Sequence, residues 1–164
     1  MKCASAVNKS SQGIRSILVK KRLTLSVCES CTGGMLGSII THVPGSSKYF
    51  LGGIIAYSND IKRRIVGVPS YVLKKYGAVS PEVAGKMAQG VRRVFKSDIG
   101  IGITGIAGPS GGSRKKPVGL VYISLSYKKS ILVKKLLLKG GRDQIRKRVC
   151  KEALSLLKCS LQSG

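Results

Sequence analysis

The feature that most constrains the fold is an apolar run, residues 23–28 (LTLSVC), that leads directly into a glycine-rich turn, residues 29–34 (ESCTGG). The run has the length of a buried strand, and a helical pattern follows the turn over residues 33–42. The first N–H groups of a helix have no partner within it, and the helix dipole adds positive charge there. We therefore expect the turn to attract negative charge, either a ligand phosphate or the oxyanion of an acyl transfer.

The rest of the chain alternates between helical and strand patterns. Apolar spacing predicts further strands over residues 50–57, 97–104, 118–126 and 131–138, and helices over residues 6–21, 60–66, 70–75, from Ser80 onward, and 141–158. The last two strands are predicted to form a hairpin that turns at Lys128 and Lys129. This order predicts a layered α/β fold with a mixed sheet, and the absence of repeats and linkers predicts one domain over residues 1–164, with a packed core over about 6–158.

The charge balance is extreme, with 30 Lys and Arg against 6 Asp and Glu, a formal net charge of +24. Such an excess attracts nucleic acid, anionic membranes or phosphorylated ligands. However, the basic residues are dispersed along the chain, aromatic residues make up only 5%, and there is no Trp. A platform for stacking bases is therefore not expected, and nucleic acid is an unlikely partner. No apolar run is long enough to cross a membrane.

The five cysteines, at positions 3, 28, 31, 150 and 159, are an odd number, and the N-terminus has no secretory apolar region. Free thiols in a reducing cytoplasm are the simplest expectation. Cys28 and Cys31 form a CxxC at the strand–helix junction, which leaves redox chemistry as an alternative. A structural or catalytic metal is not expected, because no second Cys or His pair has ligand spacing.

Ser30 is the candidate nucleophile, and it needs a base. The only histidine, His42, falls near the far end of the following helix, roughly 15 Å away, which argues against a Ser-His-Asp triad. Lys62 is an alternative base, and with Tyr57 it follows the second strand. If the first two strands are parallel, both end at the same sheet edge, and these residues meet Ser30 in a crevice. The other interpretation is that Lys62 belongs to an exposed basic helix face.

Lys62 would have to be partly neutral to act as a base. The adjacent Arg63 and Arg64 are expected to help, because like charges lower the pKa of a lysine. A second candidate anion site is the glycine-rich segment 105–113, which follows a buried strand. The glycines at 100, 102 and 105 match GxGxxG, but they lie within a strand, so a dinucleotide cofactor is not expected.

Five motifs together resemble the family of the CinA C-terminal domain. They are residues 29–34 (ESCTGG), 43–47 (VPGSS), 52–62 (GG followed by YSN and K), 77–80 (GAVS) and 104–119 (TGIAGP followed by KPVG). The resemblance covers roughly residues 6–158, and the chain looks like the standalone form of the family. It implies a three-layer α/β/α sandwich with a mixed, mostly parallel sheet, commonly assembled as a homo-oligomer, a dimer or higher.

The enzymes of that family are nicotinamide-nucleotide amidases. The resemblance implies hydrolysis of nicotinamide mononucleotide to nicotinate mononucleotide and ammonia, without a metal or cofactor. It implies that Ser30 is the nucleophile and that Tyr57 and Lys62 are its catalytic partners. The residues implied to bind substrate are Cys31, Thr32, Gly33, Gly34, Thr104, Gly105, Gly108 and Arg142. The alternative is a module of the same fold that binds a nucleotide or nucleic acid without turnover.

Overall fold

The computed structural model describes the backbone of residues 2–162 and the side chains of residues 12–162. Its helices are α1 (Lys2–Lys21), α2 (Met35–Thr41), α3 (Asn59–Arg64), α4 (Ser70–Tyr76), α5 (Pro81–Phe95) and α6 (Arg142–Gln162), with a short 3₁₀ turn, η1 (Ser46–Lys48). Its strands are β1 (Leu25–Glu29), β2 (Phe50–Ile55), β3 (Ile99–Gly105), β4 (Leu120–Tyr127) and β5 (Ser130–Leu137). Every predicted helix and strand is present. The side chain of Cys3 lies outside the described residues.

The five strands form one mixed sheet in the order β2-β1-β3-β4-β5. Strand β1 is parallel to β2 and β3, whereas β4 is antiparallel to both β3 and β5. Four of the five strands therefore point the same way, and only β4 runs against them. The predicted hairpin is confirmed, with Tyr127 opposite Ser130 across its turn.

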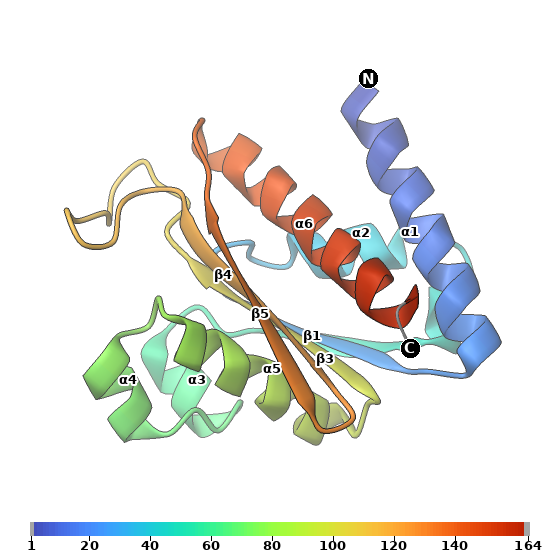
Figure 1. Ribbon diagram of the computed structural model, residues 1–164, viewed down its shortest axis with the longest axis horizontal. Coiled ribbons are helices and arrows are strands. Elements are labelled where there is room, and N and C mark those ends of the chain that lie inside the picture. Colours follow the sequence, from blue (N-terminus) through green and yellow to red (C-terminus); the bar gives the residue numbers. More distant parts are fainter. Residues whose placement is uncertain (1, 163–164) are drawn as a thin grey trace.

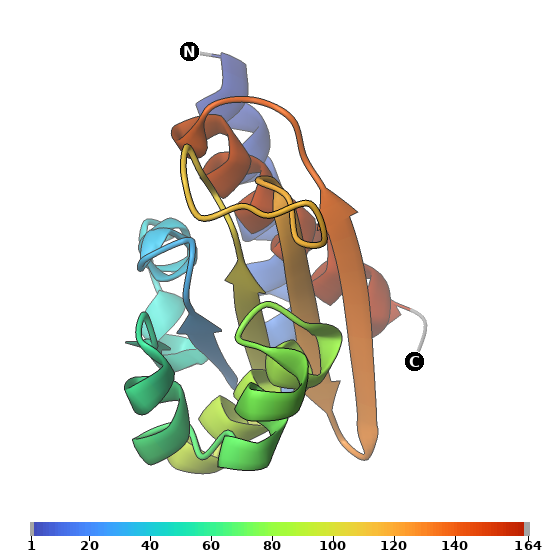
Figure 2. The same ribbon diagram turned by 90° about the vertical axis from the view of Figure 1, so that its left-hand side faces the viewer.

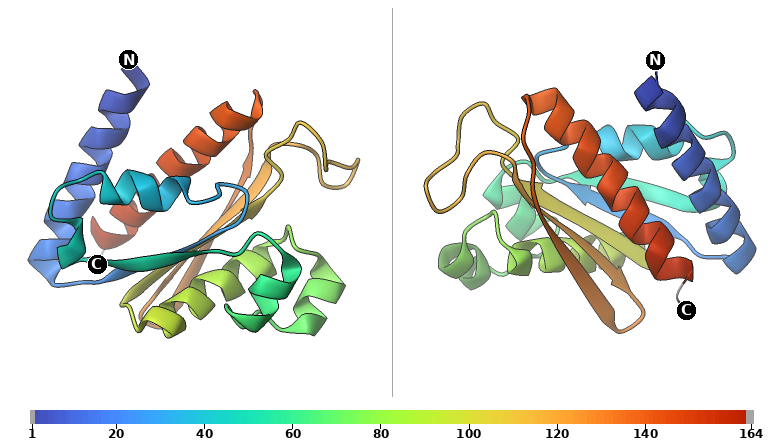
Figure 3. Two further views of the ribbon diagram at one scale, coloured as in Figure 1. Left: turned by 180° about the vertical axis from the view of Figure 1, so that it is seen from behind. Right: turned by 45° about the horizontal axis from the view of Figure 1, so that its top comes forward.

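Helices cover both faces of the sheet, which gives three layers (Figures 1 and 3). Helices α1, α2 and α6 lie on one face, where their apolar side chains join those of the central strands in the larger core, which includes Leu18, Leu36, Ile101 and Leu157. Helices α3, α4 and α5 lie on the other face over a smaller cluster around Val66, Val83 and Met87. The fold is thus the α/β sandwich that the sequence predicts.

Helix α5 packs directly on β3 because two strand positions carry no side chain. A Cβ atom at Gly100 or Gly102 would collide with the carbonyl oxygens of Ala88 or Ala84 on the helix. The first two glycines of the GxGxxG match therefore serve close helix–strand packing, whereas Gly105 lies against Val121 of β4. Helix α5 starts where the sequence predicts, directly after Ser80. The Ser80 hydroxyl caps the helix by accepting a hydrogen bond from the N–H of Val83 at 3.3 Å.

The carboxyl ends of the three parallel strands meet at one edge of the sheet, which faces the viewer in Figure 2. Main-chain hydrogen bonds continue beyond the strand ends. The N–H of Ser30 donates to Ile103 O at 3.0 Å, and the N–H of Ala56 donates to Glu29 O at 2.8 Å. The residues that follow β1 and β2 are thereby held at fixed positions. Over the described residues, none of the helices combines the length and the apolar character that crossing a bilayer requires.

Candidate active site

Ser30 and Lys62 meet at this sheet edge, although Ser30 lies in the turn after β1 and Lys62 lies on α3. The Nζ of Lys62 donates a hydrogen bond to the Oγ of Ser30 at 3.1 Å. Lys62 lies on α3, which begins at the cap residue Ser58, whose hydroxyl accepts from the N–H of Ile61 at 3.2 Å. The helix turns Lys62 inward, so that only 2% of the residue is exposed. The interpretation of Lys62 as part of an exposed basic face is therefore wrong.

Burial sets the charge state of this lysine. It lowers the pKa of Lys62 below the ordinary lysine value, and the nearby Cys28 and Cys31 oppose the shift. The sequence predicted a different cause, the repulsion by Arg63 and Arg64. Those two side chains instead reach outward to Asp60, at 2.9 and 3.3 Å. Solvent screens such exposed pairs, so they have little influence on a buried amine.

The partners of Lys62 suit a neutral amine as well as a charged one. Besides Ser30, its Nζ donates to the carbonyl oxygens of Ala56 at 2.9 Å and Tyr57 at 3.3 Å. A neutral amine has two N–H groups and one lone pair. The two carbonyls can accept the two N–H groups, and the lone pair is then left facing the hydroxyl of Ser30. That arrangement is the one a general base requires.

The negative charge at the start of α2 comes from the protein itself. The Glu29 carboxylate is 1% exposed and accepts hydrogen bonds from the N–H groups of Gly34 and Leu36, both at 3.1 Å, and Gly37, at 2.8 Å. The N–H of Gly33 donates to Ser30 O at 3.2 Å. Contrary to the expectation from the sequence, Gly33 and Gly34 therefore have no free N–H group for a ligand or an oxyanion.

A pocket of about 350 Å³ opens beside Ser30 and Lys62. Its wall also includes the following residues from the sheet edge and the adjoining loops: Cys31, Tyr57, Asn59, Ala78, Val79, Thr104, Gly105, Ile106, Ala107, Gly108, Ser110, Gly111 and Arg142. Thus the structure gathers Ser30, Lys62, Tyr57, Cys31, Thr104, Gly105, Gly108 and Arg142 of the predicted site in one place. The predicted residues Thr32, Gly33 and Gly34 do not line it.

Arg142 joins two walls of the pocket. It lies at the start of α6, where its Nη1 donates to Gly108 O at 2.8 Å and its Nη2 donates to the hydroxyl of Tyr57 at 3.1 Å. Tyr57 is 62% exposed, so its ring stands at the mouth of the pocket. Its hydroxyl contacts Arg142, whereas its carbonyl oxygen contacts Lys62. Tyr57 therefore touches both cationic side chains of the site, but not the hydroxyl of Ser30.

The glycine-rich segment forms the opposite wall. Thr104, at the end of β3, is buried, and its hydroxyl donates to Ala78 O at 2.7 Å. Lys116, three residues after the segment, donates from its Nζ to Tyr76 O at 2.6 Å. These two hydrogen bonds tie the residues on either side of the segment to the end of α4 and to the loop that follows it. The pocket is consequently enclosed by segments that are fastened to one another.

The two cysteines of the CxxC are buried and reduced. Cys28 and Cys31 are free thiols, and burial raises their pKa values to about 12 and about 11. Few thiolates exist at neutral pH under these conditions, and the thiolate is the reactive form. The redox interpretation of this motif therefore finds no support. His42, as predicted, ends up at the far end of α2, as its exposed C-cap residue.

Two residues that support the site were not predicted from the sequence. Glu29 holds the start of α2, and Arg146 donates to Thr32 O from its Nε at 3.2 Å and its Nη2 at 2.7 Å. Arg146 lies one helical turn after Arg142, a spacing that could have indicated it. Among the described side chains, no group of three His, Cys, Asp or Glu residues comes together as a metal site would need.

The comparisons with known proteins agree on one family. The family model described as the CinA C-terminal domain matches residues 7–161. A CinA-like protein of Gemmatimonas aurantiaca is 51% identical over 136 residues, which are 83% of this chain and 32% of that protein. A CinA-like protein of Pseudothermotoga lettingae is 46% identical over 149 residues, 90% of this chain and 37% of the relative. The chain thus spans about a third of the length of the curated relatives it matches.

A solved structure agrees over nearly the whole chain. The competence/damage inducible protein CihA from Agrobacterium tumefaciens has a TM-score of 0.92 at 34% identity, and the match covers 95% of both chains. The family model and the structural match each extend over nearly the whole chain. The chain belongs to the CinA C-terminal domain family.

Proposed function

We propose that this protein hydrolyses the carboxamide of nicotinamide mononucleotide to nicotinate mononucleotide and ammonia, with Ser30 as nucleophile and Lys62 as general base. One observation carries the proposal: Lys62 is buried, has a lowered pKa and lies 3.1 Å from the Oγ of Ser30 at the wall of a pocket. A lysine so placed has little structural reason to be there, because burying its charge costs free energy. A buried group with a perturbed pKa in a pocket is typical of a catalytic site.

In the first half of the reaction, neutral Lys62 takes the proton of the Ser30 hydroxyl as Oγ attacks the carboxamide carbon. The tetrahedral intermediate collapses when its C–N bond breaks, and the Lys62 ammonium gives its proton to the leaving nitrogen. Ammonia departs and an ester to Ser30 remains. In the second half, Lys62 removes a proton from water, the resulting hydroxide attacks the ester, and the proton returns to Ser30 Oγ as the acid is released.

The oxyanion needs a hydrogen-bond donor next to Ser30. The turn supplies fewer candidates than its sequence suggests, because the N–H groups of Gly33 and Gly34 are already bonded within the protein. The N–H of Cys31 remains. It adjoins Ser30 at the pocket wall, and over the described part of the chain it contacts its own thiol and donates to no other residue. We assign the oxyanion to this group.

Arg142 is the proposed partner of the substrate phosphate. It is the one arginine among the residues that line the pocket, and it can offer two N–H groups to an anion. A single guanidinium suits a ligand with one phosphate group. The pocket volume of about 350 Å³ lies in the range of small-molecule sites.

The experiment is to incubate the purified protein with nicotinamide mononucleotide and to measure ammonia and nicotinate mononucleotide together. The proposal predicts that both appear in equal amounts. Saturable binding of the mononucleotide without ammonia would contradict it and would support a binding module that lacks turnover. The oligomeric state implied by the family resemblance can be measured on the same sample by sedimentation.

A further inference from the structure

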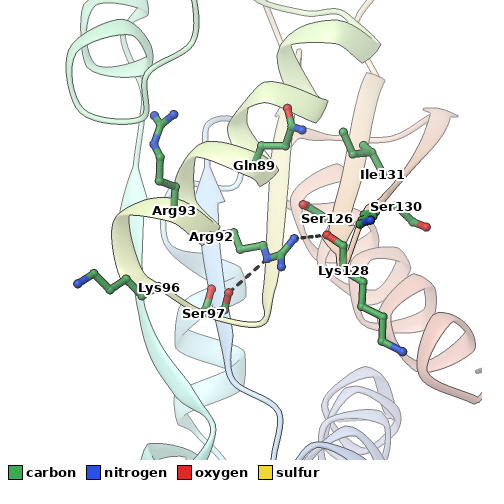
Figure 4. A pocket seen from close by; sticks show the side chains of 10 residues that line it. Gln89, Arg92, Arg93, Lys96, Ser97, Ser126, Lys128, Ser130 and Ile131 are labelled. Atoms are coloured by element: carbon green, nitrogen blue, oxygen red, sulfur yellow. Dashed lines mark hydrogen bonds between the residues drawn. The ribbon is translucent and has the colours of Figure 1, made fainter.

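A second pocket lies at the opposite end of the sheet from Ser30. It has a volume of about 480 Å³ and is formed by the C-terminal half of α5, the segment that leads into β3 and the hairpin of β4 and β5 (Figure 4). Half of its ten wall residues are cationic: Arg92, Arg93, Lys96, Lys128 and Lys129. The first three come from α5 or its cap, whereas the two lysines come from the hairpin. The fold thus brings two separate basic segments to one cavity.

No carboxylate of the chain pairs with these charges. All six acidic residues lie within residues 12–162, whose side chains the structure describes. Asp60 pairs with Arg63 and Arg64, Asp143 pairs with Lys147, and Glu152 pairs with Lys134. Glu29 binds the start of α2, and Glu82 lies at the start of α5. The charge of Arg92 helps to lower the pKa of Asp98. However, the Asp98 carboxylate accepts its hydrogen bonds from the N–H and the hydroxyl of Thr24, at 2.8 and 2.7 Å. The mutual repulsion within the pocket is therefore not offset by an ion pair inside the protein.

Arg92 is fixed at the base of this pocket. Its Nε donates to Ser97 O at 3.3 Å, and its Nη1 donates to Lys128 O at 2.6 Å. The guanidinium consequently spans the gap between the end of α5 and the hairpin turn, as Figure 4 shows. Its Nη2 donates to no group among the described residues. An immobilised guanidinium with spare N–H groups is suited to bind an anion, because little side-chain freedom remains to be lost.

Ser126 offers a hydroxyl group at the wall of the pocket. It lies on β4 opposite Gly100, it lines the pocket, and only 3% of it is exposed. Its hydroxyl has no hydrogen-bond partner among the described residues. Its side chain and that of Arg92 both line the pocket (Figure 4). The hydroxyl is not among the polar side-chain atoms that are fully closed off from solvent, so it can donate a hydrogen bond to a group that enters the pocket.

A purely structural explanation accounts for only part of this cluster. Cations in the last turn of a helix interact favourably with its dipole, and Arg92 does so at the end of α5. That explanation does not extend to Lys128 and Lys129, which belong to a hairpin. Figure 4 shows the side chains of Lys96 and Lys128 extending away from Arg92 into the surroundings. The Nζ of Lys128 lies 5.2 Å from the centre of the Tyr127 ring. Both lysines are exposed, so rotation of their side chains can bring them over an anion held at the base.

We propose that this basic pocket binds the phosphate groups of a small phosphorylated ligand. Arg92 and Ser126 donate hydrogen bonds from the base, and Lys96, Lys128 and Lys129 supply positive charge from the rim. None of the ten wall residues is aromatic, so the pocket offers no surface on which nucleic acid bases could stack. The inference is independent of the amidase proposal, because it concerns other residues at the other end of the sheet.

The test is calorimetric titration of the purified protein with inorganic pyrophosphate at physiological ionic strength. We expect saturable binding that is weakened about tenfold in the double variant Lys128→Ala/Lys129→Ala. Ser126→Ala, which removes no charge, should weaken binding about fivefold. Thermal melting shows whether each variant is folded. Lys128 has a φ of 52°, and alanine is no more strained there than lysine, so the double variant should fold.

Two controls distinguish binding at this pocket from a general effect of positive charge on the protein. Lys151→Ala/Lys158→Ala removes the same number of charges from the exposed side of α6, and Arg142→Ala removes the cation of the Ser30 pocket. The α6 variant should leave pyrophosphate affinity within about twofold of wild type. In the Arg142→Ala background, which lacks the proposed phosphate partner of the Ser30 pocket, the loss caused by Lys128→Ala/Lys129→Ala should persist. The proposal is overturned by absence of saturable binding, by an equal loss in the α6 control, or by loss in Arg142→Ala alone. It is also overturned if only a single-stranded oligonucleotide binds through Lys128 and Lys129.

Discussion

The Nζ of Lys62 lies 3.1 Å from the Oγ of Ser30, although 32 positions separate the two residues in the sequence. The contact follows from the topology, because β1 and β2 are parallel neighbours and their carboxyl ends share one edge of the sheet. Ser30 follows β1 directly, and Lys62 comes from the first helix after β2. The central pair of the proposed mechanism is thus positioned by the sheet itself.

Lys62→Met should abolish activity without destabilising the protein. Methionine fills a similar volume and has no charge to bury, so the free energy of unfolding should stay equal or rise. Loss of the base should lower the rate of ammonia release by about 10²–10⁴-fold. Urea unfolding and the ammonia assay measure the two quantities. Lys74→Met, on the exposed side of α4, is the matched control and should keep full activity.

The rate should rise with pH until Lys62 is neutral. Only the neutral amine can accept the Ser30 proton, and burial lowers the pKa of Lys62 from its ordinary value of 10.5. The acidic limb of the profile of kcat/KM against pH should therefore have its midpoint below that value, and the rate should level off above it. A profile that is flat, or that falls as the pH rises toward the midpoint, would contradict the role of Lys62 as base.

Glu29→Gln should destabilise the turn that carries Ser30. The carboxylate accepts three hydrogen bonds from N–H groups at the start of α2, whereas an amide has one acceptor oxygen and places an NH₂ group against donors. We expect a loss of about 1–3 kcal/mol in the free energy of unfolding. Glu82→Gln, at the exposed start of α5, makes the same chemical change and should cost at most about 1 kcal/mol. Equal effects in the two variants would show that Glu29 has no special structural role.

Arg142→Ala should act mainly on substrate binding. Loss of a charged partner for the phosphate is expected to raise KM about 10–100-fold, with a smaller change in kcat. Tyr57→Phe removes the hydroxyl that contacts Arg142 and should raise KM only about two- to fivefold. If Tyr57 positions Arg142, the effect of Tyr57→Phe should disappear in the Arg142→Ala background. A large drop in kcat for Tyr57→Phe would instead make Tyr57 a catalytic residue.

The sequence allowed the fold and the centre of the site to be predicted for a physical reason. Apolar periodicity is local, so the strands around Val27, Ile54 and Ile101 could be recognised one by one. Parallel strands then bring their carboxyl ends together, which places Ser30 near Lys62 without any knowledge of side-chain packing. The start of α5 at Ser80 depends on neighbouring residues only, and it too was predicted correctly.

The remaining features depend on contacts between distant segments. The motif predicts an anion at the start of α2, and the Glu29 carboxylate is that anion. Nothing in the motif indicates that the residue before Ser30 takes this place. Likewise, the lowered pKa of Lys62 comes from burial and not from Arg63, and burial is a property of the packed molecule. The bridge from Arg142 to Gly108 joins residues 34 positions apart and has no sequence signal.

The most direct test of the central claim is the rate of ammonia release from nicotinamide mononucleotide by wild type and Ser30→Ala, measured side by side. Ser38→Ala, an exposed serine on α2, is the control for the substitution itself. The account predicts ammonia from wild type and Ser38→Ala at equal rates, and a loss of at least about 10³-fold in Ser30→Ala. A Ser30→Ala protein that releases ammonia at the wild-type rate would show that Ser30 is not the nucleophile.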